Sequence, residues 1–488
     1  MRWEDLKFRL SEFWAEFKTQ KTGLLGLAVL VVLVSVAILA PFLADPTTIV
    51  NWHRIEHWEE NPRGVPPVWI NYFSVKKRAL HYVSDPELLE NKTVEKVIGN
   101  TTYKMRYETW EAEYDFTSDL PPSGIFIKIR VNQLVANISN PVLFIYFERP
   151  DEPSELSGPI FYTDITNIEL KVFLHQEEQV RSKAWFFAKS QDPTFTERVP
   201  DANQMTPERT MLVLFAKPGV GMESEATMVP LRGKYKLRIS IFFFSDQEKT
   251  EMVRVVFQGR AYGLLGTDTY GRDIYAGLVW GVWVALAIGF LTSLISIMIG
   301  LIYGVTSAYL GGKWDEVLQR LNDIVYSMPV LPLLIMMAAA WRPSIWNIVI
   351  LLAIFSWPGF AKIVRSMALQ IKEQPFVEAA KAAGASGFRI VVRHIAPQIL
   401  PYTFAVMALG VPGAILTEAG LSFLGLGDPT IPTWGQILHD ANMNAAAIKG
   451  MWWWVLPPGV AIAIVGLTFA LIGMAMDAIL NPKMRKYK

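Results

Sequence analysis

The residues of this sequence best suited to catalysis are two histidines that flank a glutamate. His53, Glu56 and His57 follow the H-x-x-E-H pattern, in which two imidazoles on one helical turn bind zinc and the carboxylate acts as a base. A catalytic zinc also needs a third ligand and a supporting pair of helices, whereas the flanking residues predict only a short helix. A membrane-anchored exoenzyme is therefore a distant alternative, and a polar turn near a membrane surface is the simpler interpretation.

Composition excludes several other kinds of chemistry. The 488 residues contain no cysteine, which excludes disulfides, thiolate catalysis and cysteine-ligated metals. The 46 Lys and Arg residues balance 45 Asp and Glu residues, so bulk charge predicts no nucleic-acid partner. No G-x-x-x-x-G-K-[ST] phosphate-binding loop occurs in the sequence, so we expect this chain to bind no ATP or other cofactor of its own.

A second candidate site is the basic segment 362–394, where helix-start and helix-stop signals follow one another. Pro375 suits the first turn of a helix, which we predict over residues 375–383, and Gly384 is expected to end it in the left-handed conformation. Ser386 is placed to cap a second short helix. Pro397 is then predicted to break the chain before the next apolar segment.

The first of these short helices presents small side chains beside one carboxylate. Ala379, Ala380 and Ala383 accompany Glu378 on the predicted helix. Small residues allow close approach of another backbone, so this short helix is suited to dock in a groove of another protein. A different carboxylate, Glu418, follows an apolar segment, and the sequence leaves open whether it is functional or a partner for the adjoining loop.

Charge-free stretches identify the elements that must position this loop. With 51% hydrophobic and 19% charged residues, the sequence contains six stretches long enough for membrane-spanning helices of about 20 residues: 22–44, 274–312, 324–341, 343–361, 395–417 and 450–476. The first is too long for the apolar core of a cleaved signal peptide, so we expect it to be retained. The fold class is an α-helical polytopic membrane protein with six spans.

Positive residues are concentrated in three segments, 1–21, 362–394 and 483–488, whereas two short loops carry only Arg342 and Lys449. Because short loops rich in Lys and Arg stay in the cytoplasm, both termini and the 362–394 loop are predicted to be cytoplasmic in a plasma-membrane protein. Residues 3–17 place apolar side chains at helical spacing, which fits either an amphipathic helix on the inner surface or an extension of the first span.

Residues 46–262 differ in character from the rest, with 26 Lys and Arg and 29 Asp and Glu residues, and the orientation places them outside the cell. Five segments rich in β-branched and aromatic residues read as strands: 125–131, 142–147, 168–174, 211–215 and 235–241. We predict an inserted all-β, sandwich-like domain of about 7 to 9 strands. Asn91, Asn100 and Asn137 begin glycosylation triplets that matter only in a glycosylating host.

The predicted organisation has five parts: 1–21 cytoplasmic amphipathic segment, 22–45 first transmembrane helix, 46–262 extracellular domain, 263–482 core with five spans and the cytoplasmic loop 362–394, and 483–488 cytoplasmic tail.

The cytoplasmic loop resembles the coupling-loop signature of ABC-importer permeases. It has Glu378-Ala379-Ala380, three further residues, Gly384, and Pro397 thirteen positions later. The chain is similar to the second (C-type) subunit of the dipeptide/oligopeptide/nickel subfamily. An entry motif before the second span matches this subfamily too, through Gly266, Thr267, Asp268, Gly271, Arg272 and Asp273. So do three later segments, 308–315, 418–427 and 432–435.

The resemblance implies a non-catalytic permease subunit in the membrane lipid. Such a subunit pairs with a homologous permease, docks two ATPase subunits that hold ATP and Mg²⁺, and takes solute from an extracellular binding protein. The implied docking residues are Glu378, Ala379, Ala380 and Gly384. Di- or oligopeptides are the implied cargo, with oligosaccharides such as β-glucosides, or nickel complexes, as open alternatives. Residues 46–262 depart from the subfamily, which has only a few tens of residues there, and we expect this block to contact the binding protein or cover the partner permease.

Overall fold

The computed structural model describes residues 14–98, 101–135, 139–153, 156–341 and 343–480. They divide into two compact units, one combining Met1–Arg54 with Ile274–Lys488 and the other comprising Ile55–Asp273. Several sequence predictions concern positions outside the described residues: most of the segment 3–17, Asn100, Asn137, Arg342 and the tail 483–488.

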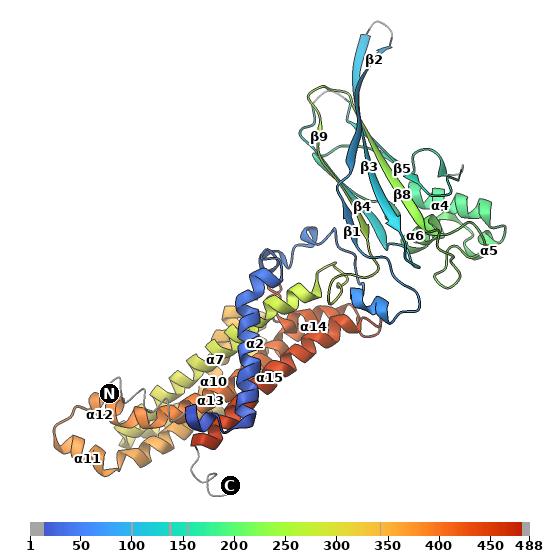
Figure 1. Ribbon diagram of the computed structural model, residues 1–488. Helices are drawn as coiled ribbons and strands as arrows, with labels where there is room; N and C mark the ends of the chain where they lie inside the picture. Colours follow the sequence, from blue (N-terminus) through green and yellow to red (C-terminus); the bar gives the residue numbers. More distant parts are fainter. Residues whose placement is uncertain (1–13, 99–100, 136–138, 154–155, 342, 481–488) are drawn as a thin grey trace. The chain divides into compact units, whose positions relative to one another are not determined.

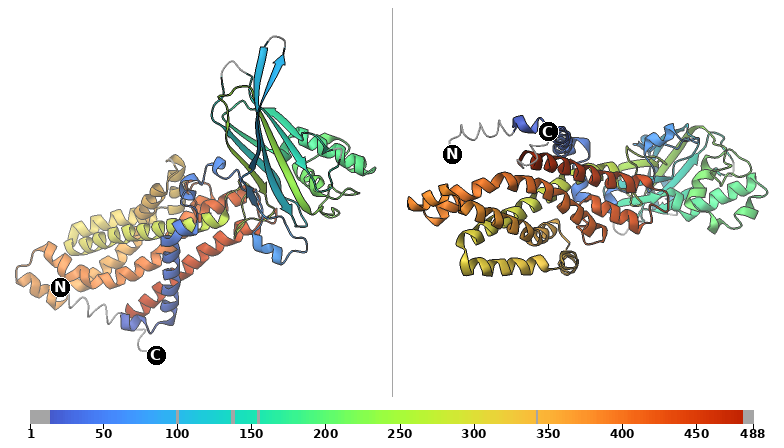
Figure 2. Two further views of the ribbon diagram at one scale, coloured as in Figure 1. Left: turned by 45° about the horizontal axis from the view of Figure 1, so that its top comes forward. Right: turned by 90° about the horizontal axis from the view of Figure 1, so that it is seen from below.

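The first unit is a bundle of long apolar helices, most of which run side by side, whereas the N-terminal one crosses the others at a steep angle (Figures 1 and 2). Five are long and apolar enough to cross a membrane: α2 (Lys21–Leu43), α7 (Ile274–Leu310), α10 (Ile345–Lys372), a continuous helix Gly387–Phe423 that ends in α13 (Ala396–Phe423), and α15 (Trp452–Leu480). Glycine allows the close approach of α2 to α15, because a Cβ added at Gly26 would lie 2.9 Å from the carbonyl oxygen of Thr468.

The predicted span 324–341 is not a single helix. Its first residues end α8 (Gly312–Ser327), and the remainder forms α9 (Val330–Ala340), an 11-residue helix that follows Pro329. Proline disfavours a helical conformation in the residue before it, here Met328, which explains the break. A helix of this length extends about 16 Å, roughly half of the hydrocarbon core. The described residues therefore contain five candidate spans rather than the predicted six.

The second unit contains nine strands among its described residues, in two antiparallel sheets. One sheet has the order β1-β9-β4-β7 and the other β2-β3-β8-β5-β6. The strands are β1 (Tyr82–Ser84), β2 (Glu87–Ile98), β3 (Thr101–Phe116), β4 (Gly124–Val131), β5 (Val142–Glu148), β6 (Phe161–Asp164), β7 (Glu169–Phe173), β8 (Gly233–Phe243) and β9 (Thr250–Gln258). Four of the five predicted strand segments coincide with β4, β5, β7 and β8.

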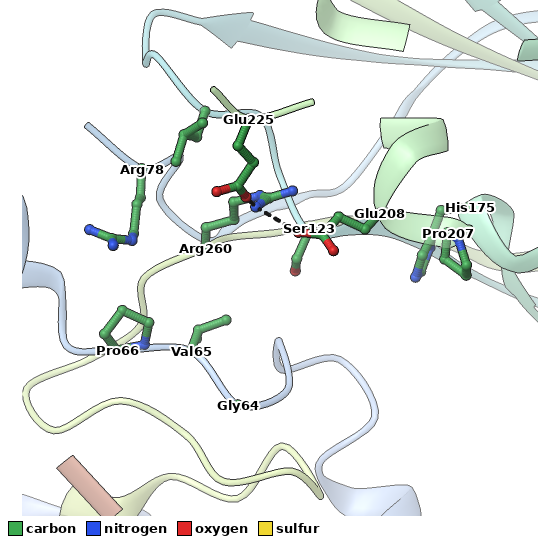
Figure 3. Close-up of a pocket in the computed structure, with 11 residues that line it drawn as sticks. Gly64, Val65, Pro66, Arg78, Ser123, His175, Pro207, Glu208, Glu225 and Arg260 are labelled. Atoms are coloured by element: carbon green, nitrogen blue, oxygen red, sulfur yellow. Dashed lines mark hydrogen bonds and ion pairs between the residues drawn. The ribbon is translucent and has the colours of Figure 1, made fainter. Parts of the chain in front are cut away.

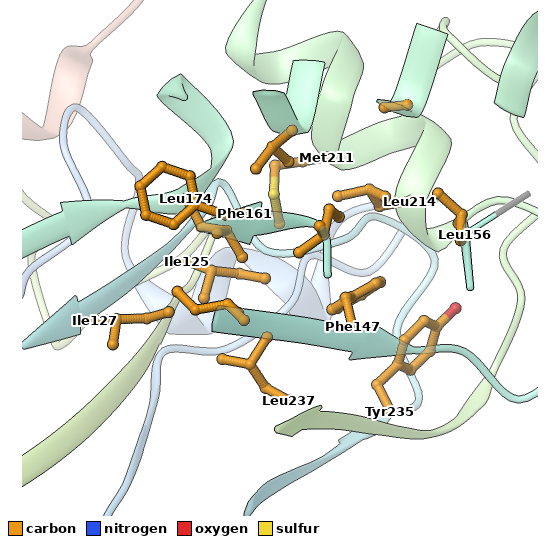
Figure 4. Close-up of a cluster of buried hydrophobic side chains, with 14 of the residues drawn as sticks. Ile125, Ile127, Phe147, Leu156, Phe161, Leu174, Met211, Leu214, Tyr235 and Leu237 are labelled. Atoms are coloured by element: carbon orange, nitrogen blue, oxygen red, sulfur yellow. The ribbon is translucent and has the colours of Figure 1, made fainter. Parts of the chain in front are cut away.

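Both sheets contribute side chains to one hydrophobic core, and two helices, α4 (Glu178–Gln191) and α6 (Pro207–Phe215), pack against it. Figure 4 shows residues of α6 beside residues of the strands, among them Met211, Leu214, Ile125 and Leu237. The guanidinium of Arg149 is buried and donates to the carbonyl oxygens of Val213 and Leu214 at 3.0 Å each, which satisfies the C-terminal end of α6.

The prediction of an all-β domain is therefore wrong in one respect, because segment 211–215 is helical rather than extended. A short, uninterrupted apolar run has no period that distinguishes a buried strand from a buried helix. The missed signal is local: Thr206 caps α6 by accepting a hydrogen bond from the backbone N–H of Arg209, and Pro207 occupies the first turn.

Candidate coupling and transport site

The candidate coupling loop forms two short helices, the first of which ends one residue before the predicted end at Ala383. α11 (Pro375–Ala382) has Pro375 in its first turn, and Gly384 follows it in the left-handed region with φ of 78°. The backbone N–H of Ala385 donates to the carbonyl oxygen of Ala380 at 3.1 Å, which closes the helix end as glycine stop signals do. Ser386 then caps α12 (Gly387–Ile390), as predicted.

The predicted break at Pro397 is wrong. A π-helical turn, η6 (Val391–Ile395), joins α12 to α13, and Pro397 lies within the first turn of α13. Proline is tolerated there because the extra residue of a π-helical turn already alters the hydrogen-bond ladder that proline would otherwise interrupt. The second coupling helix is therefore continuous with a membrane-spanning candidate.

α11 is attached to the bundle by one buried face and leaves the other face exposed. Val377 is 0% exposed and Ile390 is 1% exposed, and both join a hydrophobic cluster with α7, α10 and α13. Glu378, Ala379 and Gly384 are exposed, and Ala380 is intermediate. The exposed surface also includes two aromatic rings, Phe376 and Phe388. The loop therefore combines a fixed base with an outer surface that carries apolar side chains and charges of both signs, among them Glu378 and Lys381.

Polar contacts fix the helices from which the loop extends. Arg365 of α10 donates two hydrogen bonds to the carboxylate of Asp315 in α8, at 2.8 and 2.6 Å. These bonds lower the pKa of Asp315 below its usual value. Lys372 donates to the carbonyl oxygens of Ala308 and Tyr309, at 3.1 and 3.0 Å, at the end of α7. α7, α8 and α10 are thus tied together beside α11.

Removing Arg365 should destabilise this unit. We expect Arg365→Met to cost about 1–3 kcal/mol, because the largely buried carboxylate of Asp315 would keep only the hydrogen bond from the hydroxyl of Ser307. The difference should shrink as the pH falls through the lowered pKa of Asp315, since a protonated carboxyl no longer needs the ion pair. Thermal unfolding in detergent measures both effects. Arg320→Met is the matched control, because its pair with Glu316 is exposed and should contribute little.

A cavity of about 460 Å³ lies between α7, α10 and α13. Hydroxyl groups line part of it, from Thr292, Ser293, Ser296, Ser356 and Thr417. Ser293 donates to the carbonyl oxygen of Met407 at 2.7 Å, whereas the buried hydroxyl of Thr292 has no hydrogen-bond partner among the described residues. Hydroxyl groups on membrane-spanning helices serve helix–helix packing or line a solute path. The sequence signal was Thr292-Ser293-x-x-Ser296 in an apolar helix, which sequence reasoning overlooked.

The entry motif lies in the second unit and is built around a buried carboxylate. Asp268 is 0% exposed and accepts hydrogen bonds from the backbone N–H groups of Tyr270 and Arg272, at 2.8 and 2.9 Å. The Nε of Arg272 donates to the other oxygen of Asp268 at 2.5 Å. Burial raises the pKa of Asp268, and the hydrogen bonds from Arg272 oppose that rise. The Asp and Arg of the motif therefore form an internal ion pair.

The rest of the entry motif holds residues 62–65 in place through hydrogen bonds. The hydroxyl of Thr267 donates to the carbonyl oxygen of Pro62 at 2.7 Å and accepts from the backbone N–H of Val65 at 3.2 Å. Asp273 forms an isolated bridge with Thr267. Gly266 and Gly271 have left-handed φ angles of 71° and 85°. These contacts give the entry motif a structural role within its unit.

A substitution at Gly271 tests how much the close packing around the entry motif contributes to stability. A Cβ there would lie 2.8 Å from the carbonyl oxygen of Trp58, whereas Gly158, with a φ of 84°, has nothing within 4 Å. We expect Gly158→Ala to cost about 1 kcal/mol from conformation alone, and Gly271→Ala to cost at least about 2 kcal/mol because a clash is added. Chemical unfolding followed by near-ultraviolet circular dichroism measures the two losses. Equal losses would show that the close contact with Trp58 is unimportant.

The geometry does not support the zinc hypothesis. His53, Glu56 and His57 are exposed, and Ile55–His57 is a single 3₁₀ turn, η1, rather than an α-helix. Among the described residues, no three His, Cys, Asp or Glu side chains lie together so as to hold a metal ion. The other carboxylate left open, Glu418, is 3% exposed and accepts a hydrogen bond from Ser422 at 2.7 Å, one turn further along α13.

Comparisons with known proteins assign the helical part of the chain. Residues 296–486 match the family model for the binding-protein-dependent transport system inner membrane component, and residues 9–57 match the N-terminal TM domain of oligopeptide transport permease C. The dipeptide transport system permease protein DppC of Bacillus subtilis is 34% identical over 222 residues, which is 45% of this chain and 69% of that protein. The chain belongs to the dipeptide/oligopeptide ABC-importer permeases. It is a C-type subunit of that family.

Other permeases agree with this assignment. The oligopeptide transport system permease protein OppC of Haemophilus influenzae is 35% identical over 225 residues, 46% of this permease and 71% of its own chain. The oligopeptide transport system permease protein OppC of Bacillus subtilis is 34% identical over 222 residues. This match covers 45% of this permease and 72% of that protein. An inward-facing structure of the MetNI methionine ABC transporter aligns with 42% of this permease and 94% of its own chain at 22% identity, with a TM-score of 0.35, too low for structural inference.

Family membership fixes the coarse function. The permease is a multi-pass membrane subunit of an ATP-driven importer, in which ATP hydrolysis belongs to a separate subunit, so this chain is not an enzyme. It works with other permease, ATPase and binding-protein subunits. The matched family models leave residues 58–295 between them, so the second unit receives no assignment from the family.

Proposed function

We propose that this permease imports short peptides delivered by an extracellular binding protein. The relatives described above are named as dipeptide or oligopeptide permeases, which favours peptides over the oligosaccharide alternative. The hydroxyl-lined cavity between α7, α10 and α13 is suited to such cargo, because hydroxyl groups can replace the hydration of peptide amides.

The proposal depends above all on the arrangement of α11. Val377 fixes this helix to the bundle, while Glu378 and Ala379 remain exposed for a partner. The surface formed by Phe376, Glu378, Ala379, Ala380, Gly384 and Phe388 is our candidate docking surface for an ATPase subunit. ATP and Mg²⁺ are bound on that partner, and its movement reaches α10 and α13 as a rigid-body displacement.

The proposed assembly contains this permease, one homologous permease and two ATPase subunits. Both termini and α11 face the cytoplasm, which requires an even number of crossings. The sixth crossing is assigned to the uncharged segment 324–341, which comprises the end of α8 and all of α9. The second unit is assigned to the extracellular side, where its two sheets form a sandwich around their shared core.

The sidedness is tested by protease added outside intact cells. We expect cleavage within residues 46–262 and resistance of the loop 362–394, because only the first is proposed to face outward. Cell lysis should expose the loop, which serves as the control for intrinsic susceptibility. Cleavage of the loop in intact cells, with protection of 46–262, would reverse the proposed orientation.

A further inference from the structure

The second unit contains a charged, partly open cavity that the family assignment does not explain. Its volume is about 350 Å³, within the range of small-ligand sites, and it lies between loops beside the sheets. The residues that line it come from distant parts of that unit, and they include Pro66, Arg78, Ser123, His175, Glu208 and Arg260. Figure 3 shows the segment Gly64–Pro66 along one side and the charged side chains along the other.

The two ends of this cavity carry opposite charge. In Figure 3, Arg78 lies at one end, Glu208 and His175 lie towards the other, and Arg260 with Glu225 lies between them. Burial lowers the pKa of His175 to about 4, so its imidazole is neutral at physiological pH. Glu208 therefore supplies the charge at that end.

Neither of the charged side chains at the two ends has all of its hydrogen-bonding capacity used by other groups of the protein. Arg78 donates to the hydroxyl of Ser74 at 2.7 Å, but no carboxylate in the described part of the chain forms an ion pair with it. Glu208 has a side chain that is 64% exposed, and its contact with Nη1 of Arg260 is long, at 3.4 Å. A ligand can thus reach a guanidinium at one end and a carboxylate at the other.

In the middle of the cavity, unlike at its two ends, the charged groups are paired with each other. Arg260, whose side chain is 12% exposed, forms an ion pair with Glu225, and its buried Nε has no hydrogen-bond partner among the described residues. This pair keeps the central charge balanced while leaving one donor for a neutral acceptor, such as a peptide carbonyl oxygen.

We propose that this cavity binds a short peptide with free ends, its carboxylate on Arg78 and its ammonium group on Glu208. The choice of a peptide rests on the proposed function, whereas the requirement for two separated opposite charges rests on the cavity. A free amino acid carries both charges on one carbon atom, but each further residue separates them by about 3.5 Å. The site would hold cargo on the second unit, apart from the cavity within the helices.

Titration calorimetry on the purified full-length permease in detergent tests this site. The probes are the dipeptide alanyl-phenylalanine, its N-acetylated form, its C-terminal amide, and free phenylalanine. We expect the free dipeptide to bind, and each blocked form to bind at least about tenfold more weakly, as expected when one charged hydrogen bond is removed. Free phenylalanine should bind at least tenfold more weakly as well.

Two variants connect each end of the ligand to one residue. Arg78→Gln should abolish the preference for the free carboxylate while retaining the preference for the free amino group, and Glu208→Gln should do the reverse. Arg238→Gln and Glu148→Gln remove a partly exposed pair that does not line the cavity, so both preferences should persist. Glu208 is largely exposed, and its replacement should leave the fold unchanged.

The proposal is overturned if the folded permease binds no dipeptide at millimolar concentration, if blocked and free peptides bind equally, or if both preferences survive both cavity variants. Equal binding of free phenylalanine would also overturn it, since that ligand carries both charges on one carbon atom. Peptide uptake by cells is measured separately: uptake that depends on this permease, without binding at the cavity, rejects the site and leaves the proposed function standing.

Discussion

Gly384→Val is expected to reduce ATP-driven uptake at least tenfold while the permease remains inserted and folded. Gly384 has a φ of 78° and nothing within 4 Å of an added Cβ, so the cost arises from backbone conformation alone. A β-branched residue adopts this conformation at a cost of about 1–2 kcal/mol, and an alternative backbone would redirect α12 relative to α11. Uptake by cells and ATPase activity of the purified complex are the two measurements.

The matched control is Gly312→Val. Gly312 also has a left-handed φ, 54°, and open space around it, but it lies at the start of α8 and is not part of the candidate docking surface. The control should lose stability to a similar extent and retain most of the uptake. Normal uptake and substrate-stimulated ATPase activity in Gly384→Val would refute the coupling role of this loop.

Val377→Asp should detach α11 from the bundle and abolish uptake. Val377 is 0% exposed within the cluster formed by α7, α10 and α13, so an aspartate there would be buried without a partner. Such burial costs several kcal/mol, enough to release a short helix from its support. We expect a lower unfolding temperature, and cleavage of the loop by protease in lysed cells at lower protease concentration than for the unmodified chain.

Ala379→Asp separates docking from folding. It introduces the same charge two residues later, on the exposed surface of α11, so the unfolding temperature should not change. Association with the ATPase subunit should nevertheless weaken, because the new carboxylate sits on the proposed docking surface beside Glu378. If Ala379→Asp binds the ATPase normally and supports full uptake, the partner contacts a different face.

The local features of the coupling loop could be predicted from the sequence because short-range rules determine them. Pro375, Gly384 and Ser386 act on backbone groups within a few residues, and each takes its expected position. Long charge-free stretches likewise correspond to the five candidate spans, since membrane crossing depends mainly on length and polarity.

Features that depend on tertiary context could not be predicted in the same way. The apolar run 211–215 is helical because it lies against the sheets with Arg149 at its end, a partner more than sixty residues away. Pro397 stays within a helix because a π-helical turn precedes it. The charged cavity joins Arg78, Glu208 and Arg260, whose proximity no spacing in the sequence reveals.

The most direct test of the central claim is uptake by cells that lack this permease. We predict that they fail to accumulate a labelled dipeptide, that the unmodified gene restores accumulation, and that the Gly384→Val variant does not. Accumulation of a labelled β-glucoside should be unaffected, which separates the peptide from the oligosaccharide alternative. Undiminished dipeptide accumulation in the deletion strain, or loss of the β-glucoside instead, would contradict the assignment of this chain as a peptide-importing permease.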